Sequence, residues 1–273
     1  MNATLRHLEF FAALCDKGHF GLAAAACNVS QPALSVKIRE FEELLGSPLI
    51  DRSARPFSVT PFGADILQRA QDILSQMNAL EASARFVRGL EGPFRLGIIP
   101  TIAPYLLPGA LGLVQQKLPA LELQLREAMT DDLLDELQAG ALDACILATE
   151  VETPDLVQMP LFTDRFYLAM QEQQATELGL KDGHILPKDL EPLKLLLLAE
   201  GHCLRGQTAG ICQMSSKETL DQVGASSLMT LAGLAASGYG VTLLPQIAVD
   251  AQVMQSGLAV MRLAAPEPER VIS

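Results

Sequence analysis

One long helical pattern limits how the rest of this chain can fold. It opens at Thr60 and Pro61, and apolar or small side chains then recur every three or four residues for nearly thirty residues. These steps approximate a heptad repeat, which an isolated surface helix has no need to sustain for so long. We therefore expect residues 61–90 to form a linker helix that pairs with a second copy of the chain. The repeating positions are Phe62, Ile66, Ala70, Ile73, Met77, Leu80, Ala84 and Val87.

Residues 1–60 have the pattern of short helices joined by tight turns. An alanine-rich segment from His19 to Cys27 permits close helix packing, and a further helix is predicted from Ser30 to Gly46. Ser30 is a favourable N-cap, and Gly46 suits the C-terminal end of this helix. Two closely packed helices joined by a short turn are the basis of a helix-turn-helix. The apolar stripe of the second helix is Leu34, Ile38, Phe41 and Leu45.

The opposite face of that second helix is polar and suits the major groove of DNA. Its amide and hydroxyl side chains can bond base edges or phosphates, and a proline can contact a thymine methyl group. Arginines in the following turn would meet phosphates. The pattern alone leaves open an ordinary helical bundle with a solvated polar face. The candidate DNA-binding residues are Gln31, Pro32, Ser35, Arg39, Arg52 and Arg55.

After Pro93 the pattern changes to strands that alternate with helices, which implies βαβ units and a mainly parallel sheet. A second such unit follows from about residue 165, so the sequence indicates a two-lobed α/β regulatory domain over residues 91–273. We expect lobe I to contain about 93–163 and 266–273, and lobe II about 164–265. The expected strands are 94–100, 122–127, 143–148, 195–199 and 241–244, and the expected helices are about 105–118, 131–139 and 228–236.

Charge and composition fit a DNA-binding protein that stays inside the cell. The net charge is −12, but residues 1–90 contain nine basic and nine acidic residues, so all the excess acid lies in the second part. A neutral N-terminal unit can still present a basic face to DNA. The sequence contains neither a run of about 20 apolar residues nor the pattern of a signal peptide. We therefore expect a cytoplasmic protein with no membrane contact.

The five cysteines fall into two groups. Cys15, Cys27 and Cys145 lie in apolar stretches, where a small buried hydrophobic residue is the simpler interpretation. Cys203 and Cys212 lie instead in a glycine-rich segment. An odd number of cysteines in a mid-sized chain argues against a secreted disulfide scaffold. In a reducing compartment, a pair that does join would act as a switch.

Cys203 is the better nucleophile of the second pair. His202 and Arg205 flank it, and positive charge with a helix N-terminus should lower the pKa of its thiol. If the segment were helical, nine residues would separate the two cysteines by about 13 Å, whereas a disulfide needs Cα atoms closer than about 7 Å. Disulfide formation therefore requires this segment to unwind. Three alternatives stay open: two buried thiols, a metal pair that includes His202, and a thiol peroxidase. We expect no metal or cofactor, because no further ligand cluster lies at suitable spacing.

Residues 7–63, HLEFFAALCDKGHFGLAAAACNVSQPALSVKIREFEELLGSPLIDRSARPFSVTPFG, closely resemble the winged helix-turn-helix of LysR-type transcriptional regulators. The resemblance implies an N-terminal all-α winged domain over 1–60, a dimerising linker helix and a two-lobed α/β domain like that of periplasmic binding proteins. It also implies a homodimer or homotetramer that binds double-stranded promoter DNA and acts with RNA polymerase. It extends over nearly the whole chain.

A second group of motifs resembles the hydrogen-peroxide sensors of that family. They are GIIPTIAPYLLP (97–108), Glu127 to Thr130, Leu161 with Phe162, EGHCLR (200–205), Cys212, TLLP (242–245) and PEP (266–268). The resemblance implies that Cys203 is the peroxidatic cysteine and Cys212 the resolving cysteine, with glutaredoxin or thioredoxin as reductant. The implied peroxide pocket contains Thr101, Thr130, His202, Arg205 and Arg270.

Three points qualify this assignment. Thr130 could equally cap the helix that starts at Asp131. Gly206 stands where relatives commonly have an acidic residue, which bears on how Arg205 is tuned. The chain ends at Ser273, where relatives continue with a strand and a helix that complete lobe I, so we expect a shortened regulatory domain.

The sequence thus predicts a transcription regulator that hydrogen peroxide activates through a reversible disulfide between Cys203 and Cys212. The alternative is a LysR-type regulator that binds a small organic effector between its lobes, with the cysteines incidental. An enzyme that removes peroxide is disfavoured, because its DNA-binding segment would have no purpose.

Overall fold

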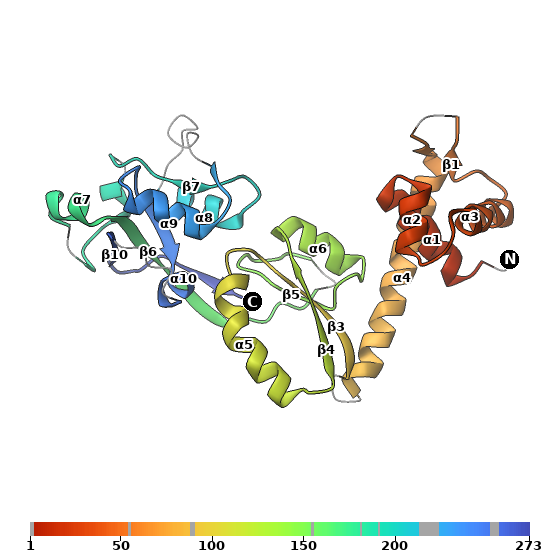
Figure 1. Ribbon diagram of the computed structural model, residues 1–273, viewed down its shortest axis with the longest axis horizontal. Coiled ribbons are helices and arrows are strands. Elements are labelled where there is room, and N and C mark those ends of the chain that lie inside the picture. The colour runs from red at the N-terminus through yellow and green to blue at the C-terminus, as the bar shows by residue number, and fades with distance from the viewer. Residues whose placement is uncertain are drawn as a thin grey trace. The chain divides into compact units, whose positions relative to one another are not determined.

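A computed structural model describes residues 3–53, 56–87, 91–153, 156–180, 182–190, 192–212, 224–251 and 257–273 of the chain. The chain forms two compact units (Figure 1). The first consists of Met1–Leu90 and Glu136–Asp143, and the second of Glu91–Asp135 and Ala144–Ser273.

The first unit is built from three short helices and one long helix. These are α1 (Leu5–Lys17), α2 (Phe20–Ala26), α3 (Gln31–Leu45) and α4 (Pro61–Val87). Helix α3 follows Ser30, whose Oγ accepts a hydrogen bond from Ala33 N at 3.4 Å. It ends at Gly46, whose φ of 74° lies in the left-handed region that glycine adopts without steric cost. Both predicted ends of this helix are confirmed.

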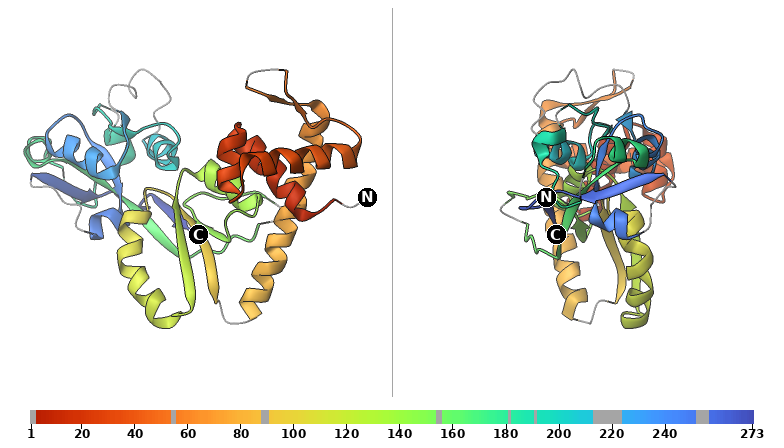
Figure 2. Two further views of the ribbon diagram at one scale, coloured as in Figure 1. Left: turned by 45° about the vertical axis from the view of Figure 1, so that its right-hand side comes forward. Right: turned by 90° about the vertical axis from the view of Figure 1, so that its left-hand side faces the viewer.

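Helices α1 to α3 gather around the first turns of α4 (Figure 2). Their shared core includes Phe11 and Leu14 of α1, and Leu34, Ile38 and Phe41 of α3, none more than 1% exposed. Burial of each such side chain contributes about 1.5–3 kcal/mol. The predicted apolar stripe of α3 is therefore confirmed, with its last member partly buried at the rim of the core.

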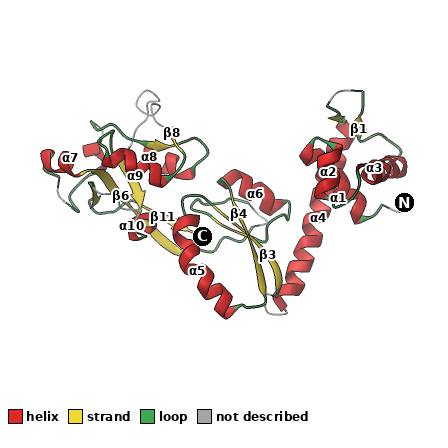
Figure 3. Cartoon of the chain, viewed as in Figure 1, coloured by secondary structure: helices red, strands yellow, loops and turns green. Residues whose placement is uncertain are grey.

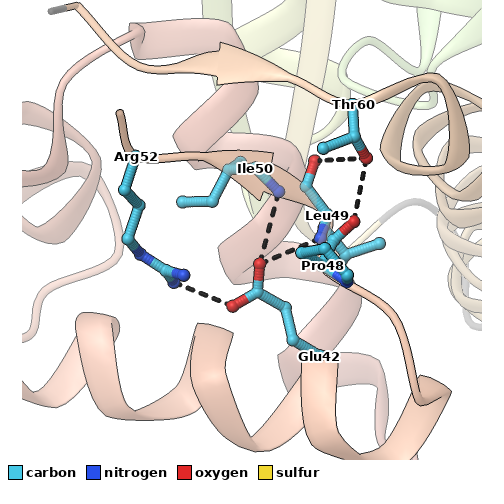
Figure 4. A network of polar contacts seen from close by, with 6 residues as sticks. All are labelled: Glu42, Pro48, Leu49, Ile50, Arg52 and Thr60. Atoms are coloured by element: carbon cyan, nitrogen blue, oxygen red, sulfur yellow. Dashed lines mark hydrogen bonds and ion pairs between the residues drawn. The ribbon is translucent and has the colours of Figure 1, made fainter. Parts of the chain in front are cut away.

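A two-stranded wing connects α3 to α4 and is held by one buried carboxylate. Strands β1 (Ile50–Asp51) and β2 (Ser58–Val59) pair antiparallel. Glu42, on α3, is only 9% exposed, and it accepts hydrogen bonds from the backbone N–H groups of Leu49 at 2.9 Å and Ile50 at 3.3 Å (Figure 4). Its second oxygen accepts from Arg52 at 2.8 Å. This carboxylate fixes the start of the wing to α3.

Gly63 lies where α4 crosses the start of the wing. A Cβ atom at this position would lie 2.1 Å from the carbonyl oxygen of Leu49, which no real contact allows. We expect Gly63→Ala to lower the free energy of unfolding of the first unit by about 1–3 kcal/mol, because backbone must shift to admit the methyl group. Urea unfolding would measure this. Gly112→Ala is the control, since a Cβ on Gly112 meets nothing within 4 Å. An equal loss in both variants would contradict the expectation.

Helix α4 leaves apolar side chains in solvent beyond its first turns. Ile73 is 46% exposed, Met77 37% and Leu80 66%. These are positions of the predicted heptad repeat, and burying their side chains against another surface would be favourable. The side chains of Ala84 and Val87 lie outside the described residues.

The second unit begins with a small parallel sheet. Strand β3 (Gly92–Ile98) lies between β4 (Leu121–Glu127) and β5 (Ala144–Ile146), and both pairings are parallel. Helix α5 (Ala103–Lys117) connects β3 to β4, and α6 (Thr130–Gln138) connects β4 to β5. This βαβαβ order agrees with the predicted strands and helices of the first α/β half.

Strand β6 (Phe162–Gln171) organises the remainder of the unit, which alternates strands and helices (Figure 3). Its first residues pair antiparallel with β11 (Glu269–Ile272), and its later residues pair antiparallel with β9 (Thr242–Pro245) and β10 (Leu258–Arg262). The expectation of a mainly parallel second half is therefore wrong. Parallel pairing is retained between β7 (Leu197–Leu198) and β8 (Gly224–Ala225). The border predicted between the lobes, at residues 163 and 164, falls inside β6.

The remaining elements complete the second unit around one apolar core. They are α7 (Glu172–Glu177), a 3-10 helix (Pro187–Leu190), α8 (Cys203–Ile211), α9 (Leu228–Ala236) and α10 (Gln246–Asp250). Leu168 of β6, Ala232 of α9 and Leu243 of β9 are fully buried in this core. Of the helices in the described part of the chain, none has the length and apolar character that crossing a bilayer requires.

Candidate functional site

Cys203 is the first residue of α8. The chain leaves β7 and turns at Gly201, whose φ of 92° favours glycine, and His202 then occupies the N-cap position. Helix α8 ends at Ile211, and Cys212 is its C-cap residue. The expectation that a helix N-terminus follows the strand at 195–199 is confirmed for Cys203.

The two cysteines occupy opposite ends of this helix and different surroundings. Cys203 is partly buried, whereas Cys212 is 1% exposed within the apolar core. Both are thiols. Nine residues of helix separate them by about 13 Å, well beyond the reach of a disulfide. A bond between them requires α8 to unwind and Cys212 to leave the core.

Helix α8 has two distinct buried faces. Leu204 and Thr208, four residues apart, are 1% and 3% exposed, and the leucine packs in the same core as Cys212. On the adjacent face, the side-chain amide of Gln207 donates to Ala148 O at 2.6 Å, beyond the end of β5. Cys203 lies four residues before Gln207 and therefore on the same face of the helix. The helix is thus held by apolar packing on one face and by polar contacts on the other.

Burial controls the ionisation of both thiols. It raises the pKa of Cys212 to about 11. It also raises the pKa of Cys203, although the Arg270 guanidinium, the Thr130 hydroxyl and the backbone N–H groups of Leu204 and Cys203 act to lower it. The prediction of a lowered pKa for Cys203 is therefore wrong, because removing the thiolate from water outweighs these favourable contacts.

The residues that flank Cys203 in the sequence are not its main electrostatic partners. Burial lowers the pKa of His202, which is 7% exposed, so its imidazole is neutral near neutral pH. The Arg205 guanidinium donates to Leu198 O at 2.8 Å. The cation that acts on the thiol is Arg270 of β11, which is far from Cys203 in the sequence but acts on it in the fold.

Arg270 is almost completely buried in a network that joins distant parts of the chain. Its Nε donates to Asp164 Oδ2 at 2.9 Å, and its Nη1 donates to Thr101 Oγ1 at 3.2 Å. Asp164, on β6, is 1% exposed and also accepts a hydrogen bond from Ile247 N at 2.9 Å. Thr101, in the turn between β3 and α5, is 2% exposed. This network fixes the guanidinium in the position from which it acts on Cys203.

Thr130 starts helix α6 but does not cap it. Its Oγ1 is buried and has no oxygen or nitrogen partner among the described residues. The polar group that its hydroxyl influences is the Cys203 thiol, whose pKa it lowers. The capping alternative is therefore not realised. Beyond its interaction with the thiol, this buried hydroxyl has hydrogen-bonding capacity left for a small polar molecule.

The structure therefore brings together most of the predicted peroxide-pocket residues, with Arg205 turned to the backbone. Sequence reasoning missed Asp164 and Gln207. Asp164 gave no clear signal, because the charged Arg165 follows it directly and the strand pattern begins with polar residues. Gln207 gave none. Of the described residues, no three histidine, cysteine, aspartate or glutamate side chains are grouped so that they could hold a metal ion.

Four of the six predicted DNA-binding residues lie at the start and outer face of α3. Gln31, Pro32 and Arg39 are exposed, and Ser35 is half-buried. Arg52 is bound to Glu42, with its side chain 43% exposed, so only part of it faces solvent. Arg55 lies outside the described residues.

Comparisons with known proteins agree with both parts of this description. Residues 5–64 match the bacterial regulatory helix-turn-helix protein, lysR family, and residues 88–273 match the LysR substrate binding domain. A probable hydrogen peroxide-inducible genes activator of Streptomyces viridosporus is 42% identical over 99% of this chain and 86% of its own length. The DNA-binding transcriptional dual regulator OxyR of Escherichia coli K12 is 37% identical over 98% and 87%.

Solved structures give the same result. A full-length OxyR variant from Pseudomonas aeruginosa is 34% identical with a TM-score of 0.78, covering 100% of this chain and 88% of that one. A peroxide-bound OxyR mutant from Corynebacterium glutamicum is 33% identical with a TM-score of 0.62, covering 100% and 85%. The chain therefore belongs to the LysR family of bacterial transcriptional regulators and, within that family, resembles OxyR.

Proposed function

We propose that this protein is a transcription regulator that hydrogen peroxide activates by joining Cys203 to Cys212. The observation that carries the proposal is the position of Cys203. Cys203 is the first residue of α8, and the buried Thr130 hydroxyl and the Arg270 guanidinium act on its thiol. Cys212 lies at the other end of the same helix. That arrangement couples a chemical change at one cysteine to the shape of the segment between them.

In the first step the Cys203 thiolate attacks one oxygen of hydrogen peroxide. The S–O bond forms as the O–O bond breaks, which gives a sulfenic acid and a hydroxide ion that takes up a proton to leave as water. Arg270 and Thr130 stabilise the thiolate and the negative charge that develops on the leaving oxygen. Thr101 and Asp164 position Arg270 for this role.

In the second step the Cys212 thiolate attacks the sulfenic sulfur. An S–S bond forms, the S–O bond breaks, and the hydroxide ion that leaves takes up a proton to become water. Helix α8 must unwind first, and Gly206 and Gly210 lower the free energy of that change, because glycine is less favourable than alanine in a helix by roughly 1 kcal/mol. A dithiol donor, thioredoxin or glutaredoxin, then reduces the disulfide and allows the helix to reform.

The rate of the first step should increase with pH. Because burial raises the pKa of Cys203, the thiolate is a minor species near neutral pH, and its population rises about tenfold per pH unit. We expect the rate constant for oxidation by peroxide to increase with that slope from about pH 6 to about pH 8. Stopped-flow measurements of sulfenic acid formation in the Cys212→Ser protein would test this. A rate that is independent of pH over this range would show that the thiol is already ionised.

The remaining parts of the chain supply DNA binding and assembly. We assign residues 1–60 to a winged helix-turn-helix, 61–90 to a dimerising linker and 91–273 to a redox-sensing domain, with lobe I at about 93–163 and 266–273 and lobe II at about 164–265. The exposed apolar side chains of α4 support a homodimer, which can assemble further into a homotetramer. The polar outer face of α3 supports contacts to promoter DNA by Gln31, Pro32, Ser35 and Arg39, with Arg52 and Arg55 on phosphates. The protein would act in the cytoplasm with RNA polymerase.

One experiment tests the proposal as a whole. Duplexes selected from a random-sequence pool by the reduced protein would be footprinted with the reduced and the peroxide-treated protein. We expect the footprint to change once mass spectrometry shows the Cys203–Cys212 disulfide. An unchanged footprint with the disulfide present would overturn the proposal.

A further inference from the structure

Gln207 joins the helix between the two cysteines to the parallel sheet of the second unit. Its Nε2 donates to Ala148 O at 2.6 Å, and Ala148 is 3% exposed. The preceding residue, Leu147, exchanges two backbone hydrogen bonds with Ser273, at 2.8 and 3.0 Å. The carbonyl that Gln207 contacts therefore lies where the chain that leaves β5 meets the chain that leaves β11.

The other half of the Gln207 amide is unpaired. Its Oε1 is buried and has no hydrogen-bond partner among the described residues. An unpaired buried acceptor is unfavourable, so the side chain is held in place by its donor end and by packing. The hydrogen bond to Ala148 O is therefore the polar interaction that holds the Gln207 side chain in place.

We propose that Gln207 is a latch that stabilises the reduced protein, because its hydrogen bond to Ala148 exists only while α8 is helical. Unwinding of residues 203–212, which the disulfide requires, moves Gln207 away from the sheet and releases the Ala148 carbonyl. The latch rests on the proposed function, and it gives the switch a second effect. Oxidation removes a contact between α8 and the chain just beyond β5, so the change is not confined to the two cysteines.

The latch has a measurable effect on the equilibrium between dithiol and disulfide. In a glutathione buffer, the protein disulfide and two glutathione molecules exchange with the protein dithiol and one oxidised glutathione. A hydrogen bond present only in the dithiol form shifts this equilibrium toward the dithiol by about fivefold. Removing the latch should therefore favour the disulfide by about the same factor.

Gln207→Glu in the full-length protein gives the sharpest test. A protonated carboxyl group can still donate a hydrogen bond to Ala148 O, whereas an ionised one repels that oxygen. Burial raises a carboxyl pKa, so the introduced carboxyl group should lose its proton between about pH 6 and pH 8. We expect the equilibrium constant of the variant to approach that of the unmodified protein at the lower pH. At the higher pH the equilibrium of the variant should lie about fivefold or more further toward the disulfide than that of the unmodified protein.

Trypsin makes the disulfide simple to quantify. Cleavage after Lys194, Arg205 and Lys217 places Cys203 in peptide 195–205 and Cys212 in peptide 206–217, so the disulfide appears as a linked pair. Gln174→Glu is the matched control. Gln174 lies on α7 and likewise has a buried, unpaired Oε1. Its variant should follow the unmodified protein at every pH.

A second variant tests the same proposal if the Gln207→Glu protein does not fold. Gln207→Ala retains helix-forming tendency and removes the donor and its packing, and it should favour the disulfide by about fivefold without pH dependence beyond that of the unmodified protein. Unmodified equilibrium constants in the Gln207 variants that fold would overturn the latch and leave the proposed function intact. Absence of the linked peptides in the unmodified protein would overturn both.

Discussion

Replacing Cys203 by serine should abolish the peroxide-induced change in DNA binding. Serine keeps the size of the side chain and the start of α8 but cannot form a sulfenic acid, so neither the disulfide nor the unwinding of the helix can follow. The affinity for a selected duplex should then be the same before and after one equivalent of peroxide. Fluorescence anisotropy of labelled DNA would measure both states.

Cys145→Ser is the matched control for this experiment. Cys145 lies on β5, outside α8, and its sulfur is 3.5 Å from Leu133 O. The Cys145→Ser protein should respond to peroxide as the unmodified protein does. A full response in the Cys203→Ser protein would contradict the redox mechanism and favour a regulator that binds a small effector, with cysteines that are incidental.

Removing the Asp164 carboxylate should strongly destabilise the second unit. Asp164→Ala leaves the guanidinium of Arg270, which is 4% exposed, without its counter-charge, and it leaves Ile247 N without an acceptor. Breaking one partner of a buried ion pair costs about 3–5 kcal/mol. We expect a loss of that size in the free energy of unfolding, measured with urea on the reduced protein.

Asp182→Ala is the control for buried charge. Asp182 pairs with Arg262 at 3.2 Å, but both side chains are 54% exposed, so this pair contributes at most about 1 kcal/mol. Equal losses of unfolding free energy in the two variants would contradict this expectation, because they would show that the buried Asp164–Arg270 pair stabilises the protein no more than an exposed pair does.

The local features of this fold could be predicted from the sequence. Ser30 and Gly46 define the ends of α3 through short-range hydrogen bonding and backbone conformation, and the spacing of Leu34, Ile38 and Phe41 indicates which face is buried. These signals act over a few residues. The same is true of the strands and helices of the parallel sheet, which follow one another in the chain.

Pairing between distant strands could not be predicted in this way. Strand β6 is joined by β9, β10 and β11, which lie about 70 to 110 residues later in the chain. Periodicity indicates that a segment is a strand, but it contains no information on which strand becomes its neighbour. The antiparallel arrangement around β6 was missed for this reason.

In the candidate site too, local features could be predicted from the sequence and contacts between distant residues could not. The motif around Cys203 is continuous in the sequence, and the sequence predicts that its neighbours His202 and Arg205 supply the positive charge. The cation that acts on the thiol is Arg270, which is held by Asp164 from 106 residues away. Burial, which raises the pKa of the thiol, likewise depends on the folded surroundings and not on adjacent residues.

Peptide mapping after one equivalent of hydrogen peroxide tests the central claim most directly. The full-length protein would be treated, its remaining thiols blocked at low pH, and the tryptic digest examined by mass spectrometry. We expect peptide 195–205 to become linked to peptide 206–217 through Cys203 and Cys212, while Cys15, Cys27 and Cys145 stay reduced. Free thiols at Cys203 and Cys212 after the peroxide has been consumed would contradict it.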